Sequence, residues 1–425
     1  MHWYHAQTKH SYYSIRSNLN SMDWANQPST YKSYPSSFEK ITLDKTNPWH
    51  SVVYYSASIS AEKFYPPSTR YFLRTNPSAG ALYPNELYFQ ARGVKGFRDG
   101  IYHYEVKTNQ AVFLYTLEDN EGIEPYMGYR TAMRGLLFLV SAIYYRSAWK
   151  YKDRAFRYSL LDAGHLLGSI EHSALLMPHA TTMRYNIERE KLNLMFGFAN
   201  REFFLAGASV AVPIREQEVN RVKFSLAYVE GAGSFEQNET IELAYRTTST
   251  LINPKAKKKN PKLIYRPERL KESIVNRRSQ RGFEGKAITK AQYNMVMDAI
   301  TASIISDCDE QVELFVVVNR VYDMPIGLYH EKKLLKNEDF SQKAGYLCLE
   351  QYALAQDGAM TFFLLSSAKN YQALYQKAGI IGQRLYMVAE YLDIGCSGIG
   401  AYYDNEVNAF VEHEGMVLYA LAIGR

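Results

Sequence analysis

Two apolar strand patterns occur in the first half of the chain and return in the same order in the second half. GIYHYE begins at Gly100 and GLYHEK at Gly327, while LLFLVSA begins at Leu136 and FFLLSSA at Phe362. The two offsets, 227 and 226 residues, keep the halves in step over this distance. Short apolar or alternating runs of this kind predict strands, and self-similarity at a fixed offset predicts a repeated structural unit.

A helix and a closing strand follow in each half. The helix is predicted for RYSLLDAGHLLGSIEHSALLM, from Arg157, and for LYQKAGIIGQRLYMVAEYLDIG, from Leu374. The alternating runs EFFLAGASVAVP and MVLYALAIGR predict the closing strands. The first half carries eleven extra residues between its second strand and its helix. Each half is therefore expected to be an α+β unit of strand, strand, helix and strand.

The domain organisation follows from this repeat. Residues 1–230 are expected to form the first unit and residues 266–425 the second. Between them, residues 231–265 contain GAGS, a polar run and the basic run KAKKKNPK, which is typical of an exposed linker. Two further helices are predicted, from Lys271 and from Ile288, on apolar residues that recur at spacings of three and four.

Composition excludes several classes of protein. Of the 425 residues, 47% are hydrophobic and 22% charged, which suits a globular chain with a large core. The net charge of +6 is too small and too dispersed to favour nucleic-acid binding. Three cysteines without a C-x-x-C pair argue against a disulfide scaffold or a zinc ribbon. No signal peptide or membrane span is recognisable, so the expected location is the cytoplasm.

Three segments are candidates for chemistry. NPSAGALYPNELY, from Asn76, has a small-residue loop that lets backbone groups approach a flat ligand, although an ordinary turn has the same composition. NRRSQRGF, from Asn276, has three arginines and a serine that suit a phosphoryl group, or else form a solvated basic turn.

The third segment is DIGCSGIGAYYD, from Asp393, which we interpret as a glycine-rich loop after a helix. It is not a dinucleotide-binding fingerprint, because that motif requires a strand first and a helix afterwards. Cys396 within it is either a nucleophile or a packed thiol, and the lack of a His and Asp partner pattern favours the packed thiol. His165 and His172 are too widely spaced for a metal site, so no metal is expected.

Taken together, four segments resemble one family. PSAGALYP, the run WKYKDRAFRYSLLDAGH from Trp149, RRSQRGF and GCSGIGAYYD are similar, in this order, to the SagB-type dehydrogenases of the FMN-dependent nitroreductase-like superfamily. That branch includes the azoline oxidases, and the N-terminal YHAQTKHSYYS and MDWANQP resemble its long tandem members. The resemblance implies an oxidoreductase built from two nitroreductase-like units, each a sheet flanked by helices.

The resemblance also implies which residues bind FMN. Phosphate contacts are expected from Arg277, Arg278, Ser279, Arg281 and Arg425. The ring system is expected to lie against Pro77, Ser78, Ala79 and Gly80 on one side and the backbone of Gly398, Gly400 and Ala401 on the other. An N–H from this last backbone would point toward N5 of the flavin, where the cofactor performs hydride chemistry.

The motifs are divided between the halves. The arginine and GCSGIGA motifs occur only in the second half, and PSAGALYP occurs only in the first. Family members are generally homodimers with FMN at the interface, so a chain with both halves is expected to form an intrachain pseudo-dimer with one composite site. We expect a monomer, or a dimer whose interface lies away from the flavin.

The resemblance implies a catalytic pair as well. Azoline oxidases have a Lys–Tyr pair associated with substrate oxidation, and it corresponds here to Lys150 and Tyr151, within the eleven-residue insertion. Either side chain would remove or relay a proton. The alternative is a Lys side chain beside a packed Tyr in a chain with 36 tyrosines.

Three functions remain open at this point. The first is a dehydrogenase acting on a peptide-like or small organic substrate, such as an azoline that is oxidised to an azole. The second is an NAD(P)H-dependent reductase of nitro or quinone compounds, because hydride flows in both directions within the superfamily. The third is a non-catalytic binding or maturation partner with a flavin fold.

Overall fold

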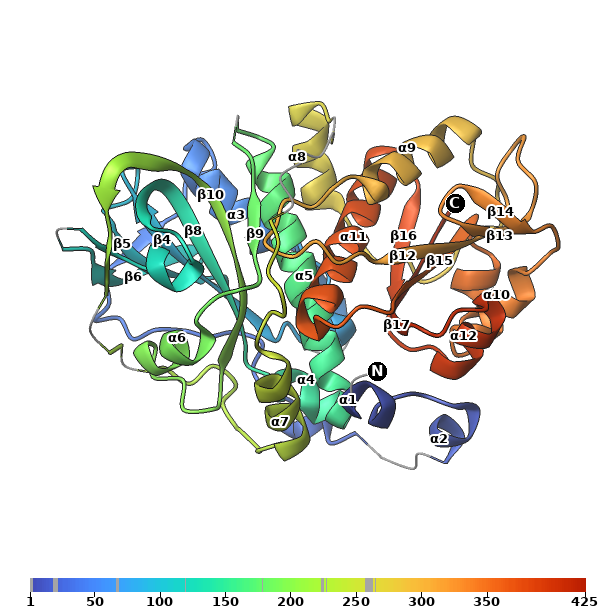
Figure 1. Cartoon of the computed structure of the whole chain (residues 1–425), viewed down its shortest axis with the longest axis horizontal. Helices are drawn as coiled ribbons and strands as arrows, with labels where there is room; N and C mark the ends of the chain where they lie inside the picture. The colour runs from blue at the N-terminus through green and yellow to red at the C-terminus, as the bar shows by residue number, and fades with distance from the viewer. Residues whose placement is uncertain are drawn as a thin grey trace. The chain divides into compact units, whose positions relative to one another are not determined.

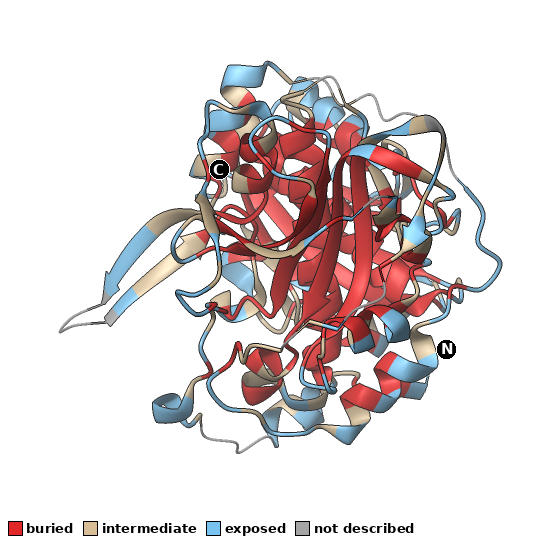
Figure 2. Ribbon diagram, turned by 90° about the vertical axis from the view of Figure 1, so that its left-hand side faces the viewer, coloured by how far each residue is buried: buried red, intermediate tan, exposed pale blue. Residues whose placement is uncertain are grey.

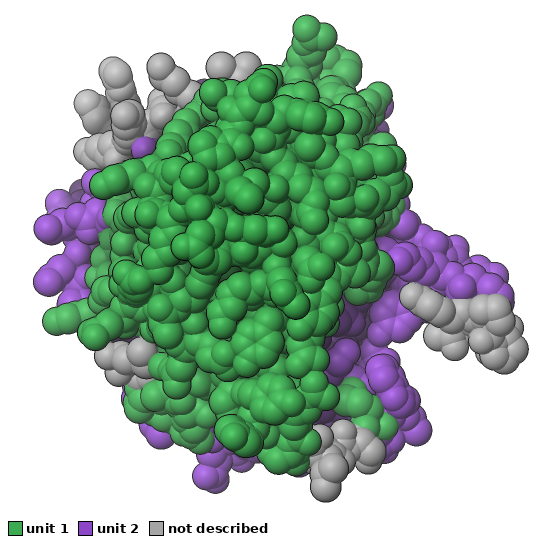
Figure 3. Space-filling view, turned by 90° about the vertical axis from the view of Figure 1, so that its right-hand side faces the viewer, with its two compact units in different colours: residues 1–22, 262–302, 310–425 green, residues 23–261, 303–309 purple. Residues whose placement is uncertain are grey.

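The chain forms two compact units. The computed structural model describes residues 3–17, 22–65, 69–118, 120–177, 179–222, 225–226, 228–256, 263 and 265–425. Unit 1 comprises Met1–Met22, Lys262–Ala302 and Glu310–Arg425, and unit 2 comprises Asp23–Pro261 and Ser303–Asp309 (Figure 3). No helix of the described residues is long and apolar enough to cross a membrane.

Unit 2 is built on a seven-stranded antiparallel sheet in the order β1-β6-β5-β4-β8-β10-β9 (Figure 1). Its strands are β1 (Lys40–Thr42), β4 (Asn85–Arg92), β5 (Gly100–Glu105), β6 (Gln110–Thr116), β8 (Thr131–Ala142), β9 (Thr182–Arg184) and β10 (Phe203–Glu218). All eight residues of β4 and most of β8 are buried, so both faces of these central strands are covered (Figure 2). A separate hairpin pairs β2 (Ile59–Tyr65) with β3 (Thr69–Arg74), and β7 (Glu121–Gly122) pairs in parallel with β11 (Asn220–Arg221).

The helices of unit 2 are α3 (Pro48–Ala57), α4 (Tyr145–Tyr151), α5 (Ala155–Ala174), α6 (Arg189–Met195) and α7 (Glu239–Thr248). Every residue of α5 is buried, which makes it a central helix of the unit. Asn47 starts α3 by accepting hydrogen bonds from the N–H groups of Trp49 and His50, with Pro48 in the first turn. The eleven-residue insertion of the first half is α4 together with the short turn that follows it.

Unit 1 has a six-stranded antiparallel sheet in the order β14-β13-β12-β15-β17-β16. Its strands are β12 (Glu313–Val318), β13 (Gly327–His330), β14 (Lys333–Lys336), β15 (Met360–Ser366), β16 (Gly395–Ile399) and β17 (Met416–Gly424). Its helices are α1 (Trp3–Gln7), α2 (Tyr12–Arg16), α8 (Pro267–Asn276), α9 (Lys290–Thr301), α10 (Ser341–Leu347), α11 (Tyr371–Tyr391) and α12 (Asp404–Val411). The first 19 residues of α11 are buried, so α11 is the central buried helix of unit 1, as α5 is of unit 2.

The two sheets share one strand order. β6-β5-β4-β8-β10-β9 of unit 2 corresponds position by position to β14-β13-β12-β15-β17-β16 of unit 1. The strands predicted from Gly100, Leu136, Gly327 and Phe362 occupy equivalent places in these sheets, and the two predicted long helices are α5 and α11. The α+β fold class expected from the repeat is therefore confirmed.

The compact units differ from the sequence-based boundaries in three places. The N-terminal segment belongs to the unit of the second half, because Tyr4 and His5 are fully buried against Tyr371 and Tyr375. Residues 303–309 belong to the unit of the first half, where Ser306 forms a bridge with Met183. The expected linker 231–265 includes helix α7, which Asn238 caps, while most of its basic run lies outside the described residues.

Candidate functional site

The PSAGALYP segment of unit 2 is a tight coil rather than an extended loop. Ala79–Ala81 forms one short helical turn, and Gly80, Ala81 and Tyr83 all have left-handed backbone angles, with φ of 63°, 55° and 45°. This conformation is unstrained for glycine and costs free energy at Ala81 and Tyr83. The coil therefore needs hydrogen bonds from neighbouring elements to keep its shape.

Ser78 is the centre of those hydrogen bonds. Its hydroxyl donates to Asp162 Oδ2 of α5 at 2.5 Å and accepts from the Tyr83 N–H at 2.9 Å. The Ala79 N–H donates to Asp162 Oδ1 at 3.2 Å. The start of the coil is thus bonded directly to one buried carboxylate, and Tyr83 is connected to it through Ser78.

Lys150 and Tyr151 lie directly over this coil. A β-carbon added to Gly80 would lie 2.7 Å from the Tyr151 hydroxyl oxygen and 3.3 Å from Lys150 Nζ. The structure therefore brings together Ser78, Ala79, Gly80, Lys150 and Tyr151, although the two segments are some 70 residues apart in the chain. Any side chain at position 80 would push the pair away.

Burial keeps Tyr151 protonated. It raises the pKa of the Tyr151 phenol well above its usual value, and the nearby Tyr158 and Asp162 raise the pKa further. The rings of Tyr151 and Tyr158 are 4.4 Å apart. Tyr151 is consequently suited to donate a hydrogen bond rather than to remove a proton at neutral pH.

Helix α4, which carries the pair, is held by a buried ion network. Arg146 Nη1 contacts Glu86 Oε1 of β4 at 2.6 Å and donates to the Tyr83 carbonyl at 2.8 Å. His103 Nε2 lies 2.8 Å from the other Glu86 oxygen. Burial alone would raise the pKa of Glu86, but Arg146 and His103 outweigh it and lower the pKa to about 2.

This network predicts a specific acid sensitivity. Glu86 binds a proton less readily in the folded state than in the unfolded state, so its stabilising effect is present above about pH 4.5 and is lost as pH falls toward 2. We expect Glu86→Gln to reduce the free energy of unfolding at pH 7 by roughly 3–5 kcal/mol, because it leaves Arg146 buried beside a neutral group. Denaturant unfolding of the apoprotein between pH 3 and 8 measures this.

The matched control is Glu39→Gln, which breaks an exposed ion pair with Arg98. Exposed pairs contribute about 0–1 kcal/mol, so this variant should unfold much like the wild type. Equal stability of the two variants at pH 7 would contradict the structural role assigned to Glu86.

The arginine motif of unit 1 begins where α8 ends. Arg277, which is 3% exposed, lies with its guanidinium 5.1 Å from the ring centre of Tyr386 on α11. Arg278 donates to the Val275 carbonyl at 2.9 Å, and Ser279 and Arg281 are exposed. Two guanidinium groups and a hydroxyl next to one another form a donor set that fits a phosphate.

Tyr386 connects this motif to the glycine-rich segment. Its hydroxyl lies 2.8 Å from Ser279 Oγ and accepts the Gly398 N–H at 2.7 Å. Burial raises the pKa of Tyr386 to about 12, so the phenol proton is present at neutral pH. When the Tyr386 hydroxyl donates a hydrogen bond to Ser279 Oγ, the serine hydroxyl can donate its own hydrogen bond to another acceptor.

The prediction of a glycine-rich loop is wrong for Gly395–Ile399, which is the edge strand β16. The strand forms because it pairs along its length with β17, and Ser279 adds a bridge to Cys396 on its other side. A side chain at Gly398 would overlap the Tyr419 hydroxyl, which explains the glycine. The Gly398 N–H donates to the Tyr386 hydroxyl, so this one of the three expected backbone positions is already engaged.

Cys396 is a packed thiol, as the sequence favoured. It is 3% exposed, and burial raises the pKa of the thiol well above its usual value although Arg277 acts in the opposite direction. A protonated, buried thiol is a poor nucleophile.

Arg425 and Gly400 mark opposite ends of β16. Gly395 pairs with Gly424, so the exposed Arg425 lies at the start of β16, where its carbonyl accepts the Glu284 N–H at 2.5 Å. Gly400 and Ala401 are half-buried and follow the end of the strand. Five residues of strand separate these positions by about 15 Å.

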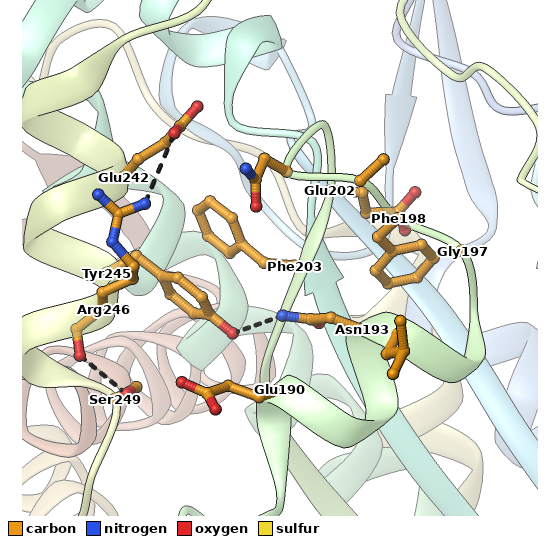
Figure 4. Close-up of a pocket in the computed structure, with 13 residues that line it drawn as sticks. Glu190, Asn193, Gly197, Phe198, Glu202, Phe203, Glu242, Tyr245, Arg246 and Ser249 are labelled. Atoms are coloured by element: carbon orange, nitrogen blue, oxygen red, sulfur yellow. Dashed lines mark hydrogen bonds and ion pairs between the residues drawn. The ribbon is translucent and has the colours of Figure 1, made fainter.

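A separate cavity lies in unit 2 between α6, the start of β10 and α7 (Figure 4). Its volume is about 440 Å³, and none of the candidate site residues lines it. Asn193 donates to the Tyr245 hydroxyl at 2.9 Å, the Tyr245 ring stacks on Phe203 at 4.0 Å, and Arg246 pairs with Glu242. Several of its polar groups are thus engaged with one another, and Glu202 is bonded to Lys32, Tyr88 and Ser141.

Two residues of the candidate site were missed by the sequence reasoning. Asp162 lies within the quoted run from Trp149, and Tyr386 lies within the second long helix. A carboxylate in a helix that is otherwise suited to complete burial was a usable signal, because buried carboxylates require partners. No sequence feature distinguished Tyr386 from the other tyrosines among the 36 in the chain.

Comparison with known proteins agrees with the fold described above. Residues 274–425 match the nitroreductase family model. A candidate nitroreductase of Methanocaldococcus jannaschii is 32% identical over 101 residues, which are 23% of this chain and 50% of that protein. The chain thus matches about half the length of that curated relative.

The crystal structure of a candidate nitroreductase from Anabaena variabilis covers both units. It superposes with a TM-score of 0.80 at 24% identity, over 99% of this chain and 98% of that chain. The whole chain therefore has a nitroreductase-like fold, and its residues 274–425 match the nitroreductase family.

Proposed function

We propose that this protein is an FMN-dependent oxidoreductase of the SagB-type dehydrogenase kind, which transfers hydride between the flavin and a peptide-like or small organic substrate. The observation that carries the proposal is the position of Lys150 and Tyr151 against the Gly80 coil. A nitroreductase-like fold alone does not specify a reaction. A lysine and a protonated tyrosine gathered at a coil of small residues supply polar hydrogen-bonding groups beside backbone that a flat ring can approach.

In this proposal the arginine group of unit 1 holds the FMN phosphate. Arg277, Arg278 and Ser279 supply charged and hydroxyl donors, with Arg281 and Arg425 adding positive charge. The position of Arg425 at the start of β16, and of Gly400 and Ala401 after its end, supports phosphate binding at one end and ring contact at the other. FMN, when bound, supplies hydride transfer at N5.

The residues of unit 2 would act on the ring and the substrate. Pro77, Ser78, Ala79 and Gly80 present a surface with little side chain. Tyr151 would donate a hydrogen bond to a substrate heteroatom, since its phenol stays protonated. Lys150 would hold or move the proton that leaves the substrate. An azoline ring, whose oxidation to an azole removes a hydride and a proton, is one substrate of the required kind.

We expect one FMN per chain, because each of the three cofactor motifs occurs only once in the sequence. Absorption spectra of the purified or reconstituted protein, with the protein concentration from amino-acid analysis, give the ratio. Two flavins per chain would contradict the single composite site. No flavin after reconstitution would overturn the proposed function.

A chain that contains both units is expected to complete its flavin site without a second copy. We predict that the holoprotein, diluted to nanomolar concentration, keeps its flavin. Light scattering combined with flavin fluorescence measures mass and flavin release together. Flavin release that follows the dissociation of subunits would show that a partner copy contributes to the site.

An NAD(P)H-dependent reductase of nitro or quinone compounds is the second candidate, favoured by the names of the proteins that match this chain. Stopped-flow mixing of the holoprotein with NADH or NADPH distinguishes the two. Rapid bleaching of the flavin absorbance supports the reductase. Slow or absent bleaching, with reduction by an azoline-containing peptide, supports the dehydrogenase.

A further inference from the structure

Asp162 is a buried carboxylate whose described partners are neutral. It is 4% exposed on α5 and receives hydrogen bonds from the Ser78 hydroxyl and the Ala79 N–H. Buried carboxylates are usually stabilised by a cation, and burying a charge without one is costly. The hydrogen bonds from Ser78 and Ala79 therefore provide much of the stabilisation that the Asp162 carboxylate receives from unit 2.

Asp162 in turn stabilises the conformation of the coil. Ala81 and Tyr83 have left-handed backbone angles that cost free energy in any other setting. Ser78 connects Asp162 to Tyr83 at the far end of the coil, because the same hydroxyl donates a hydrogen bond to Asp162 and accepts one from the Tyr83 N–H at 2.9 Å. Losing the Asp162 carboxylate would remove the acceptor of the Ser78 hydroxyl and the Ala79 N–H and so loosen the coil, although Arg146 would still donate to the Tyr83 carbonyl.

We propose that Asp162 is a positioning residue, whose carboxylate holds the Ser78–Tyr83 coil in the shape that seats Tyr151 and Lys150 at Gly80. The hydrogen bonds from Ser78 and Ala79 and the close approach of the pair to Gly80 carry this inference. The inference that Asp162 holds the coil needs no assumption about function. The inference that Asp162 affects turnover rests on the proposed function.

The ionisation of Asp162 offers a readout of this role. Burial raises its pKa to about 7, while Ser78 and Ala79 act in the opposite direction. Among the described residues, the groups around Asp162 and the coil that titrate or carry charge include Tyr151 and Lys150 of α4 and Tyr158, one turn earlier on α5. Arg146 donates to the Tyr83 carbonyl, and the Arg74 guanidinium lies 4.4 Å from the centre of the Tyr83 ring. The Ser78 and Ala79 donors both favour the ionised carboxylate, so the coil should be held best above pH 7 and loosen as pH falls below it.

Hydrogen exchange of the apoprotein tests the inference without any cofactor. At pH 8, Asp162→Asn is expected to speed exchange of the Ala79 and Tyr83 amides roughly 10–100-fold, the loss expected for a charge-assisted hydrogen bond. Ser78→Ala should have the same effect from the coil side and keeps the test available if the Asn variant does not fold. Ser173→Ala, which removes a buried hydroxyl from the same helix, is the matched control.

The pH dependence separates positioning from a merely structural role. Wild-type protection of these amides, corrected for intrinsic exchange, should fall below about pH 7, and Asp162→Asn should abolish that step. In the holoprotein the same variant should lower kcat roughly 10–100-fold with FMN bound, since misplaced groups have effects of this size. Unchanged exchange in both folded variants would overturn the inference. Failure of the wild type to bind FMN would overturn the proposed function alone.

Discussion

Lys150→Ala and Tyr151→Phe are each expected to lower turnover of the oxidised substrate by about 10²–10⁴-fold, the usual effect of losing or misplacing a proton-transfer group. FMN occupancy should remain, because the proposed phosphate contacts follow α8 and β17, away from α4 in the sequence. Steady-state kinetics combined with the flavin-to-chain ratio of each variant measure both quantities.

Lys152→Ala is the matched control for this pair. It removes the same charge two residues from Lys150, and Lys152 is exposed, with its ammonium on the Trp149 carbonyl at 3.3 Å. We expect its turnover to stay close to that of the wild type. Normal turnover of Lys150→Ala and Tyr151→Phe with flavin bound would reduce the pair to a structural role. Loss of flavin from both would place α4 in the cofactor site.

Arg277→Ala is expected to weaken FMN binding by roughly 1.5–3 kcal/mol, or about 10–150-fold in Kd, because one charge-assisted phosphate contact is lost. Titration of the apoprotein with FMN, followed by the quenching of flavin fluorescence, measures the change. Arg277→Lys should recover part of the affinity, since an ammonium keeps the charge and loses the planar fork.

Arg266→Ala provides the control for this measurement, because it removes an exposed arginine that precedes the same helix. Its Kd for FMN should match the wild type. Since Arg277 is buried, thermal unfolding of the apoprotein must accompany the titration. A folded Arg277→Ala variant with unchanged affinity would remove this residue from the phosphate site.

Local sequence patterns were sufficient where burial is continuous along an element. The apolar runs of β8 and β15 were predicted because both strands are buried along nearly their whole length, so almost every position is apolar or small. The long helices α5 and α11 were predicted from their matching places in the repeat. The segment that forms β16 was not predicted to be a strand, for the opposite reason. Gly395 and Gly398 disfavour a strand locally, and only pairing with β17 makes this segment extended.

The candidate site was predicted as a set of motifs, and its internal geometry was not. The resemblance identified Ser78, Gly80, Lys150 and Tyr151 separately, but the contact between the coil and the pair required the fold. Asp162 and Tyr386 entered only with the structure, because each acts through hydrogen bonds to residues far away in the chain.

The amino-acid sequence by itself determined the repeated α+β pattern and the division of the motifs between the halves, since both depend on residue type and spacing, while the candidate residues came from the resemblance of those motifs to a known family. Only the tertiary structure decided that the N-terminal segment packs with the second half, where Tyr4 and His5 are buried, and that one carboxylate holds the Gly80 coil. These features arise from contacts between segments distant in the chain, and the free energy of such contacts depends on burial and hydrogen-bond geometry that no local pattern encodes.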